Sequence, residues 1–149
     1  MKQFVFVALV ALVMACAPMA NAKVSKFPGI TVDVPNGWKA AKSTNGVELR
    51  TSDGLEVHVE TFAFREGLEQ TILDGMINAF QAKDVRKNEE NGMTEFTGNN
   101  GWGYFIKFCK SGHAISYAVT NPKLMSEKYS KDFSAIMQGV ADNNGNKFK

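Results

Sequence analysis

Three ionisable side chains at alternating positions of one short stretch could hold a metal ion. The stretch is LEVHVETF, residues 55–62, and the side chains are Glu56, His58 and Glu60. An imidazole and two carboxylates are ordinary ligands of zinc and of other divalent transition metals. In a strand, however, alternate residues lie about 6–7 Å apart and their tips diverge. The predicted metal site therefore competes with a simpler interpretation, the solvated face of a sheet.

The hydrophobic pattern around this stretch predicts the hairpin that would position it. The sequence GVELRTSDGLEVHVETFAF contains two alternating strands, and a three-residue loop at 52–54 would join them. That loop pairs Leu49 with Val57 and Val47 with Val59, whereas a two-residue loop would mix apolar and polar residues on both faces. The register predicts one polar stripe with complementary charges across the strands. Its members are Glu48, Arg50, Glu56, His58 and Glu60.

Nucleophilic catalysis by Cys109 is a second chemistry to consider. The chain has two cysteines, Cys16 and Cys109, and only two histidines, His58 and His113, either of which would have to act as the base. A lone cysteine is more simply explained as a buried, inert residue that packs as a small hydrophobe. We therefore predict no catalytic residue and no cofactor.

The segment around Cys109 predicts a second hairpin. In WGYFIKFCKSGHAISYAVTN, residues 102–121, a two-residue loop at 111–112 pairs Phe108 with Ile115 and Cys109 with Ala114. This register gathers the large side chains on one face, which is expected to meet the helices. It places Cys109 among small neighbours on the other face and His113 at the hairpin tip, pointing away from the thiol.

The remaining pattern predicts an α+β fold. Residues 30–34 alternate as a strand before a turn at 35–37, and weak strands are expected around turns at 91–92 and 99–101. Asn121 and Pro122 mark the start of a last helix. We predict an antiparallel sheet of about six strands with two amphipathic helices packed on it, in the order β-β-β-α-β-β-β-α. The apolar stripes of the two helices are Leu68, Ile72, Met76, Ala79 and Phe80, and Met125, Tyr129, Phe133, Ile136, Met137 and Val140.

The first residues have the features of an export signal. Lys2 precedes an uncharged apolar segment, residues 4–15, that is too short for a permanent membrane anchor. Residues 20–22, Ala-Asn-Ala, form a cleavage site that would make 1–22 the signal peptide. The alternative is a lipoprotein signal, 1–15, with Cys16 lipidated. We expect a single domain over 23–141, a flexible tail over 142–149 and no transmembrane span in the mature chain.

Charge and motifs exclude several classes of function. The leader carries one of the 17 basic residues and none of the 15 acidic ones, so a mature chain would have a net charge of +1. This balance gives no attraction to nucleic acid. The sequence has no phosphate loop, no dinucleotide fingerprint and no His-Glu-x-x-His motif.

The order of elements resembles the PsbP-like fold, which includes the small DcrB-type envelope proteins of bacteria. The resemblance rests on the opening ITVDVPNGW, the hairpin after it and the closing amphipathic segment SEKYSKDFSAIMQGV. It implies an accessory or binding role without catalysis at a membrane surface, and it carries over no site residue.

These observations leave three classes of function. The first is an exported, non-catalytic binding or assembly-accessory module, periplasmic or extracellular, whose partner is an unknown envelope protein. The second is a carrier of a small ligand or metal, using the Glu56, His58 and Glu60 stripe or a cleft lined by Trp38, Phe62 and Phe64. The third is a small cysteine-dependent enzyme. We expect a monomer or a weak dimer.

Overall fold

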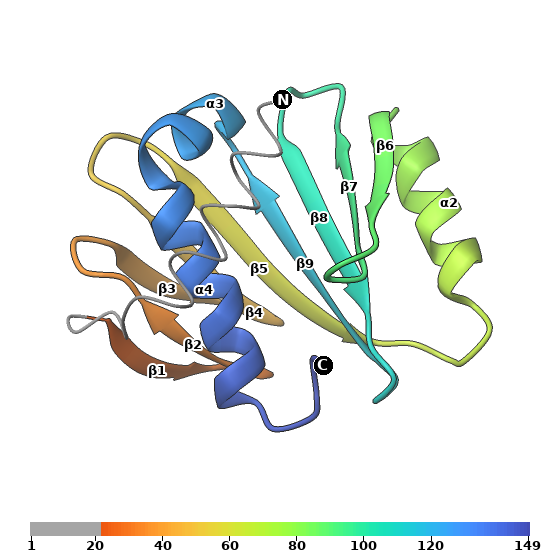
Figure 1. Ribbon diagram of the computed structural model, residues 1–149, viewed down its shortest axis with the longest axis horizontal. Helices are drawn as coiled ribbons and strands as arrows, with labels where there is room; N and C mark the ends of the chain where they lie inside the picture. The colour runs from red at the N-terminus through yellow and green to blue at the C-terminus, as the bar shows by residue number, and fades with distance from the viewer. Residues whose placement is uncertain (1–21) are drawn as a thin grey trace.

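The computed structural model describes residues 22–149 and shows an α+β protein (Figure 1). Residues 1–21 of the predicted signal peptide, Cys16 among them, lie outside the described residues. The strands are β1 (Lys23–Phe27), β2 (Ile30–Val34), β3 (Lys39–Ser43), β4 (Gly46–Arg50), β5 (Glu56–Ala63), β6 (Lys83–Asn88), β7 (Met93–Thr97), β8 (Gly103–Phe108) and β9 (His113–Val119). The helices are α2 (Glu69–Ala79), α3 (Pro122–Leu124), the π-helical turn η1 (Met125–Tyr129) and α4 (Ser130–Asn143).

Seven of these strands form one antiparallel sheet in the order β3-β4-β5-β9-β8-β7-β6, and β1 pairs with β2 in a separate ribbon. The predicted fold class is confirmed, with more strands than the six expected. The strands that the pattern missed are β1 and β3, whose sequences KVSKF and KAAKS are rich in lysine and mostly exposed. Neither has the apolar alternation by which a half-buried strand is recognised.

The helix α4 covers one face of the sheet and forms the core with it (Figure 1). The ring of Phe133, on this helix, lies 5.2 Å from that of Phe105 and 5.7 Å from that of Tyr117, measured between ring centroids. The predicted stripe of this helix is confirmed, because most of its members are buried. The fully buried residues of the core include Phe133, Ile136 and Val140 from the helix and Val32, Leu49, Val57 and Val59 from the strands.

The helix α2 lies against the opposite face, at the β6 end of the sheet. Phe80, at the end of the helix, stacks on Tyr104 with a centroid distance of 4.6 Å. Tyr104 alternates with Phe105, which faces α4, so the two helices lie on different sides. The predicted helix is confirmed, but no residue of α2 is buried, and Leu68 is 42% exposed. The apolar stripe of α2, expected to lie in the core, is therefore only partly covered.

The predicted register of the second hairpin is wrong. Phe108 pairs with Ala114 and Lys107 with Ile115, and the backbone nitrogen of Cys109 donates to the carbonyl of His113 at 2.9 Å. The loop therefore has three residues, 110–112, and Gly112 takes a left-handed φ of 84°. On the face away from α4, large residues of β8 pair with small residues of β9, whereas on the α4 face Phe105 pairs with Tyr117. Cys109 consequently lies on the α4 side, in the main core, instead of among small neighbours on the other face.

The C-terminal segment is anchored. Asn121 caps the last helix as predicted, since its side chain accepts from the backbone nitrogen of Leu124 at 3.0 Å. The domain end expected at 141 falls inside α4. The segment expected to be a flexible tail, 142–149, instead packs against the domain. Phe148 is 3% exposed and belongs to the core. The side-chain nitrogen of Asn144 donates to the carbonyl of Thr31 at 2.8 Å. The side-chain oxygen of Asn144 accepts from the backbone nitrogen of Thr31 at 2.9 Å.

Within residues 22–149, no helix combines the length and the hydrophobicity that a membrane span requires.

Candidate functional site

The hairpin of β4 and β5 positions the ionisable stripe as the sequence predicts. Glu48 pairs with His58, Leu49 with Val57, and Arg50 with Glu56. The backbone nitrogen of Thr51 donates to the carbonyl of Leu55 at 2.9 Å and closes the three-residue loop. The apolar residues between these positions face the α4 side, so the ionisable side chains share the opposite face of the sheet, which α4 does not cover.

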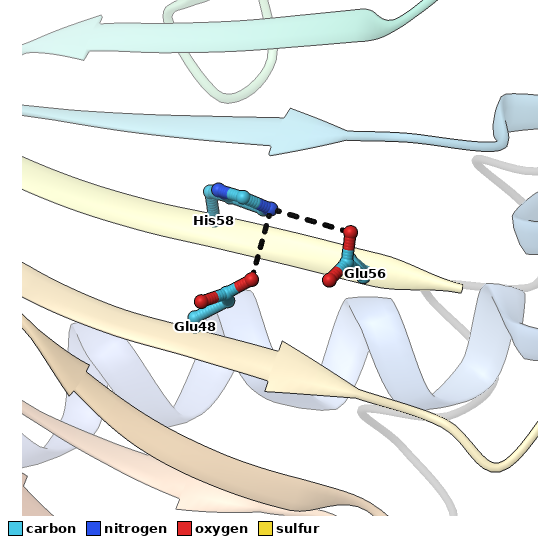
Figure 2. Close-up of side chains that lie close together, drawn as sticks. All are labelled: Glu48, Glu56 and His58. Atoms are coloured by element: carbon cyan, nitrogen blue, oxygen red, sulfur yellow. Dashed lines mark ion pairs between the residues drawn. The ribbon is translucent and has the colours of Figure 1, made fainter. Parts of the chain in front are cut away.

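Glu48, Glu56 and His58 converge on one point of that face (Figure 2). The Nε2 atom of His58 lies 3.4 Å from Oε1 of Glu48 and 3.8 Å from Oε2 of Glu56. One potential ligand atom from each of the three residues lies within 4.8 Å of the other two. Glu48 reaches the imidazole from across the strand pair, where side chains are closest.

Glu60 is not part of this group. It was predicted as a ligand because it lies two residues beyond His58 on the same strand, but its side chain is exposed and outside the converging set. Glu56 and His58 of the predicted trio thus lie in the converging group, and Glu48 takes the place of Glu60 there. The sequence contained the signal for Glu48, because the derived register already placed it opposite His58.

Arg50 joins the two carboxylates. Its guanidinium lies 2.6 Å from Oε1 of Glu48 and 2.8 Å from Oε1 of Glu56. The hydrogen bond from Arg50 is the largest cause that lowers the pKa of the Glu48 carboxyl below its ordinary value of 4.5. Glu48 is therefore anionic at neutral pH, and the two carboxylates already share one cation.

The imidazole of His58 lies in a sheltered place although part of its side chain is exposed. Its Nε2 atom has no accessible surface and makes no hydrogen bond. The ring of Trp102 lies against it, with 5.4 Å between the ring centroids and a tilt of 48°. Trp102 thus covers the imidazole, while Nε2 points at the two carboxylates.

The α4 face has a cleft at the end of the sheet that the long helix leaves uncovered. Its volume is about 490 Å³, and it lies between the strands β6 to β8 and the start of the C-terminal helix. Arg86 and Glu95 form an ion pair of 3.0 Å in its wall. The other lining residues include Asp84, Lys87, Thr97, Phe105, Pro122, Met125 and Ser126.

Cys109, directly after β8, pairs with His113 at the start of β9, but the thiol is not activated. The residue is 4% exposed, and burial raises the pKa of the thiol. Nucleophilic cysteines instead have a lowered pKa and an accessible sulfur. The Nδ1 atom of His113 makes no hydrogen bond, so no third group orients this imidazole through it.

The aromatic residues expected to line one cleft lie on different faces. Trp38 is buried in the core, donates through Nε1 to Oδ2 of Asp132 at 2.8 Å and packs edge-on against Tyr129. Phe62 and Phe64 lie on the opposite face and pack edge-on against Phe108. The cleft predicted from Trp38, Phe62 and Phe64 is therefore not formed.

Comparisons with known proteins give a similarity in fold only. No family model and no curated protein matches this sequence. The solution structure of cyanobacterial PsbP (CyanoP) from Synechocystis sp. PCC 6803 is similar, with a TM-score of 0.46 and 12% sequence identity, over 84% of this chain and 95% of that chain. The PsbP-like and DcrB-type relationships stay predictions. A similarity this loose supports no statement about activity or partners.

Proposed function

We propose that this protein is an exported, non-catalytic module that binds a segment of a partner protein. The observation that carries the proposal is the cleft of about 490 Å³ on the uncovered end of the α4 face. Binding pockets commonly have volumes of about 300–1,000 Å³ and combine apolar walls with a few polar groups. Phe105 and Met125 supply apolar surface here, and the Arg86–Glu95 pair supplies oriented charge.

The non-catalytic part of the proposal rests on the state of the reactive side chains. The Cys109 thiol is buried and its pKa is raised, so it lacks the thiolate that covalent catalysis needs. The carboxylates nearest His58 are occupied by Arg50. Neither arrangement offers a nucleophile paired with an oriented base.

Export is proposed from residues 1–22 of the sequence, which have a charged start, an apolar segment and a small-residue cleavage site. The mass of the denatured protein isolated from its own host tests this. A chain that begins at Lys23 means cleavage after Ala22, and a lipid-bearing Cys16 means a membrane-tethered module. A chain that retains residues 1–22 would contradict export.

Crosslinking in intact host cells tests the binding surface. A photoreactive residue at Ser126, which lines the cleft, is expected to capture one partner, whereas the same residue at Asp74 on α2 should not. Arg86→Glu should abolish the Ser126 adduct because it reverses a charge in the cleft wall. Lys39→Glu, the same charge change on the exposed strand β3, should leave it intact.

The outcomes separate the proposal from its alternatives. Equal capture from Ser126 and Asp74, or no effect of Arg86→Glu, would remove the cleft as the binding surface. A small molecule that remains in the native mass of the purified protein, with no protein adduct, would favour the carrier instead.

A further inference from the structure

We infer that Glu48, Glu56 and His58 form a binding site for one divalent transition-metal ion, Zn²⁺ or Cu²⁺. Ligand atoms that surround zinc tetrahedrally at about 2.0–2.2 Å lie about 3.3–3.6 Å from one another. The Nε2 atom of His58 lies 3.4 Å and 3.8 Å from oxygens of Glu48 and Glu56. Small rotations of the two carboxylate side chains would therefore complete three corners of a coordination sphere (Figure 2).

The state of His58 is a second, independent observation. Its Nε2 atom is shielded from solvent and makes no hydrogen bond, although it points at two acceptors. A buried polar atom without a hydrogen bond is unfavourable, so this nitrogen gains from any partner that approaches it. A metal ion between the three side chains would supply that partner and would neutralise the two carboxylates at once.

Arg50 is the internal competitor for this site. It already pairs with Glu48 and Glu56, but its side chain is 56% exposed, so solvent can hydrate it when it leaves them. Metal binding would displace the guanidinium and break its ion pairs. The measured affinity of the protein for the metal would therefore be lower than that of the same three ligands without Arg50. Removing Arg50 should consequently strengthen metal binding, whereas a purely structural ion-pair cluster would lose order without it.

The donor set selects the kind of metal. One imidazole nitrogen with two carboxylate oxygens favours Zn²⁺ or Cu²⁺ over Ca²⁺ and Mg²⁺, which prefer oxygen ligands alone.

The inference goes beyond the proposed binding function and does not rest on it. The cluster lies on one face of the sheet and the cleft on the other, so either can fail without the other.

Calorimetric titration of the chelator-treated mature protein with Zn²⁺ tests the site. The wild type should bind one ion, and Glu48→Gln, Glu56→Gln and His58→Ala should each weaken binding about tenfold or more. Glu60→Gln is the matched control, because it removes an acid from the same strand outside the cluster, and it should change binding less than about twofold. Arg50→Gln should strengthen binding several-fold. Circular dichroism would confirm that each variant is folded.

Cu²⁺ gives a second readout at the same place. The ion quenches nearby tryptophan fluorescence, and Trp102 contacts His58 whereas Trp38 is buried in the core. We expect quenching that disappears in Trp102→Phe and is weakened in His58→Ala. Zn²⁺ binding that is unchanged in His58→Ala, or weakened equally by Glu60→Gln, would overturn the site.

Discussion

At the scale of single residues, Asp53 links the β4–β5 turn to the C-terminal helix by hydrogen bonds. Its carboxylate accepts hydrogen bonds from Nζ of Lys128 and the hydroxyl of Tyr129, both at 2.8 Å, and from Oγ1 of Thr51 at 2.6 Å. These hydrogen bonds, that from Lys128 first, hold the pKa of Asp53 well below its ordinary value of 3.8. A turn residue thus joins two parts of the chain that lie far apart in sequence.

We predict that Asp53→Asn destabilises the protein in a pH-dependent way. A depressed pKa in the folded state contributes stability that is fully present above the ordinary pKa and is lost as the pH falls through the folded-state value. The Tm of the variant should be a few degrees lower at pH 7, and the difference should shrink below about pH 4. Thermal denaturation from pH 7 to pH 2 measures it. Glu66→Gln, at an exposed loop acid, is the control; a difference that grows in acid would contradict the prediction.

Cys109 should react slowly in the folded protein. Its sulfur is buried and burial raises the pKa of the thiol, so both access and ionisation are limited. With a disulfide reagent at pH 8, labelling should be at least about 100-fold slower than in denaturant, since it requires the structure to open. Labelling as fast as in the unfolded chain would restore Cys109 as a candidate nucleophile.

The sequence predicted the candidate site in part. Alternation along LEVHVETF identified Glu56 and His58, and the register placed Glu48 opposite the imidazole. Glu60 lies outside the converging group, because proximity across two strands brought Glu48 closer to His58 than spacing along one strand brought Glu60. The cover from Trp102 could not be predicted, since it depends on where the loop before β8 lies relative to β5.

At the scale of elements, Gly139 lets α4 approach β2 closely. A Cβ atom at this position would lie 2.9 Å from the Cβ atom of Asp33, which is closer than such atoms approach in folded proteins. Asn143, one turn further, donates to Oδ1 of Asp33 at 2.9 Å. The helix therefore packs closely against the ribbon of β1 and β2 at a small residue, and a hydrogen bond one turn further holds it there.

Glycine-to-alanine changes in the two helices should have opposite effects. Alanine is favoured over glycine in a helix by about 1 kcal/mol at either position. Gly75 in α2 has nothing within 4 Å of an added Cβ, so Gly75→Ala should stabilise the protein by about 0.5–1 kcal/mol. Gly139→Ala must push Asp33 aside and should destabilise it by about 1–3 kcal/mol. Urea denaturation of both variants measures this; a stabilised Gly139→Ala would show that α4 has room to shift.

The two large hairpins show what a hydrophobic pattern can determine. In β4 and β5, only one register keeps all charged residues on one face, so the prediction was unique. In β8, large residues lie on both faces, whereas β9 alternates large and small residues, and both sheet faces are partly covered by a helix. Either register hides apolar surface, so the sequence did not discriminate between the two loop lengths.

At the scale of the whole molecule, the two ends of the described chain close on each other. Asn144 bonds to both backbone groups of Thr31, and Nζ of Lys147 donates to the carbonyl of Gly29 at 2.9 Å. Phe148 fills the core beneath them. The polar sequence DNNGNKFK gave no sign of this, because a single apolar residue has no period. The backbone groups that Asn144 and Lys147 bond lie more than 100 positions away in the sequence.

Two substitutions should distinguish the stability of the whole domain from that of the β1–β2 ribbon, Phe148→Ala and Asn144→Ala. Removing a buried phenylalanine ring should lower the free energy of unfolding by about 2–4 kcal/mol. Asn144→Ala loses hydrogen bonds worth about 1–2 kcal/mol together and should act mainly on the β1–β2 ribbon. Hydrogen exchange should then be faster at the Thr31 amide, which donates to Asn144, while amides in β5 and β9 keep their protection. Urea denaturation and exchange measured by NMR give the two quantities. If Phe148→Ala is as stable as Lys149→Ala, its exposed neighbour, the segment after α4 is free of the core.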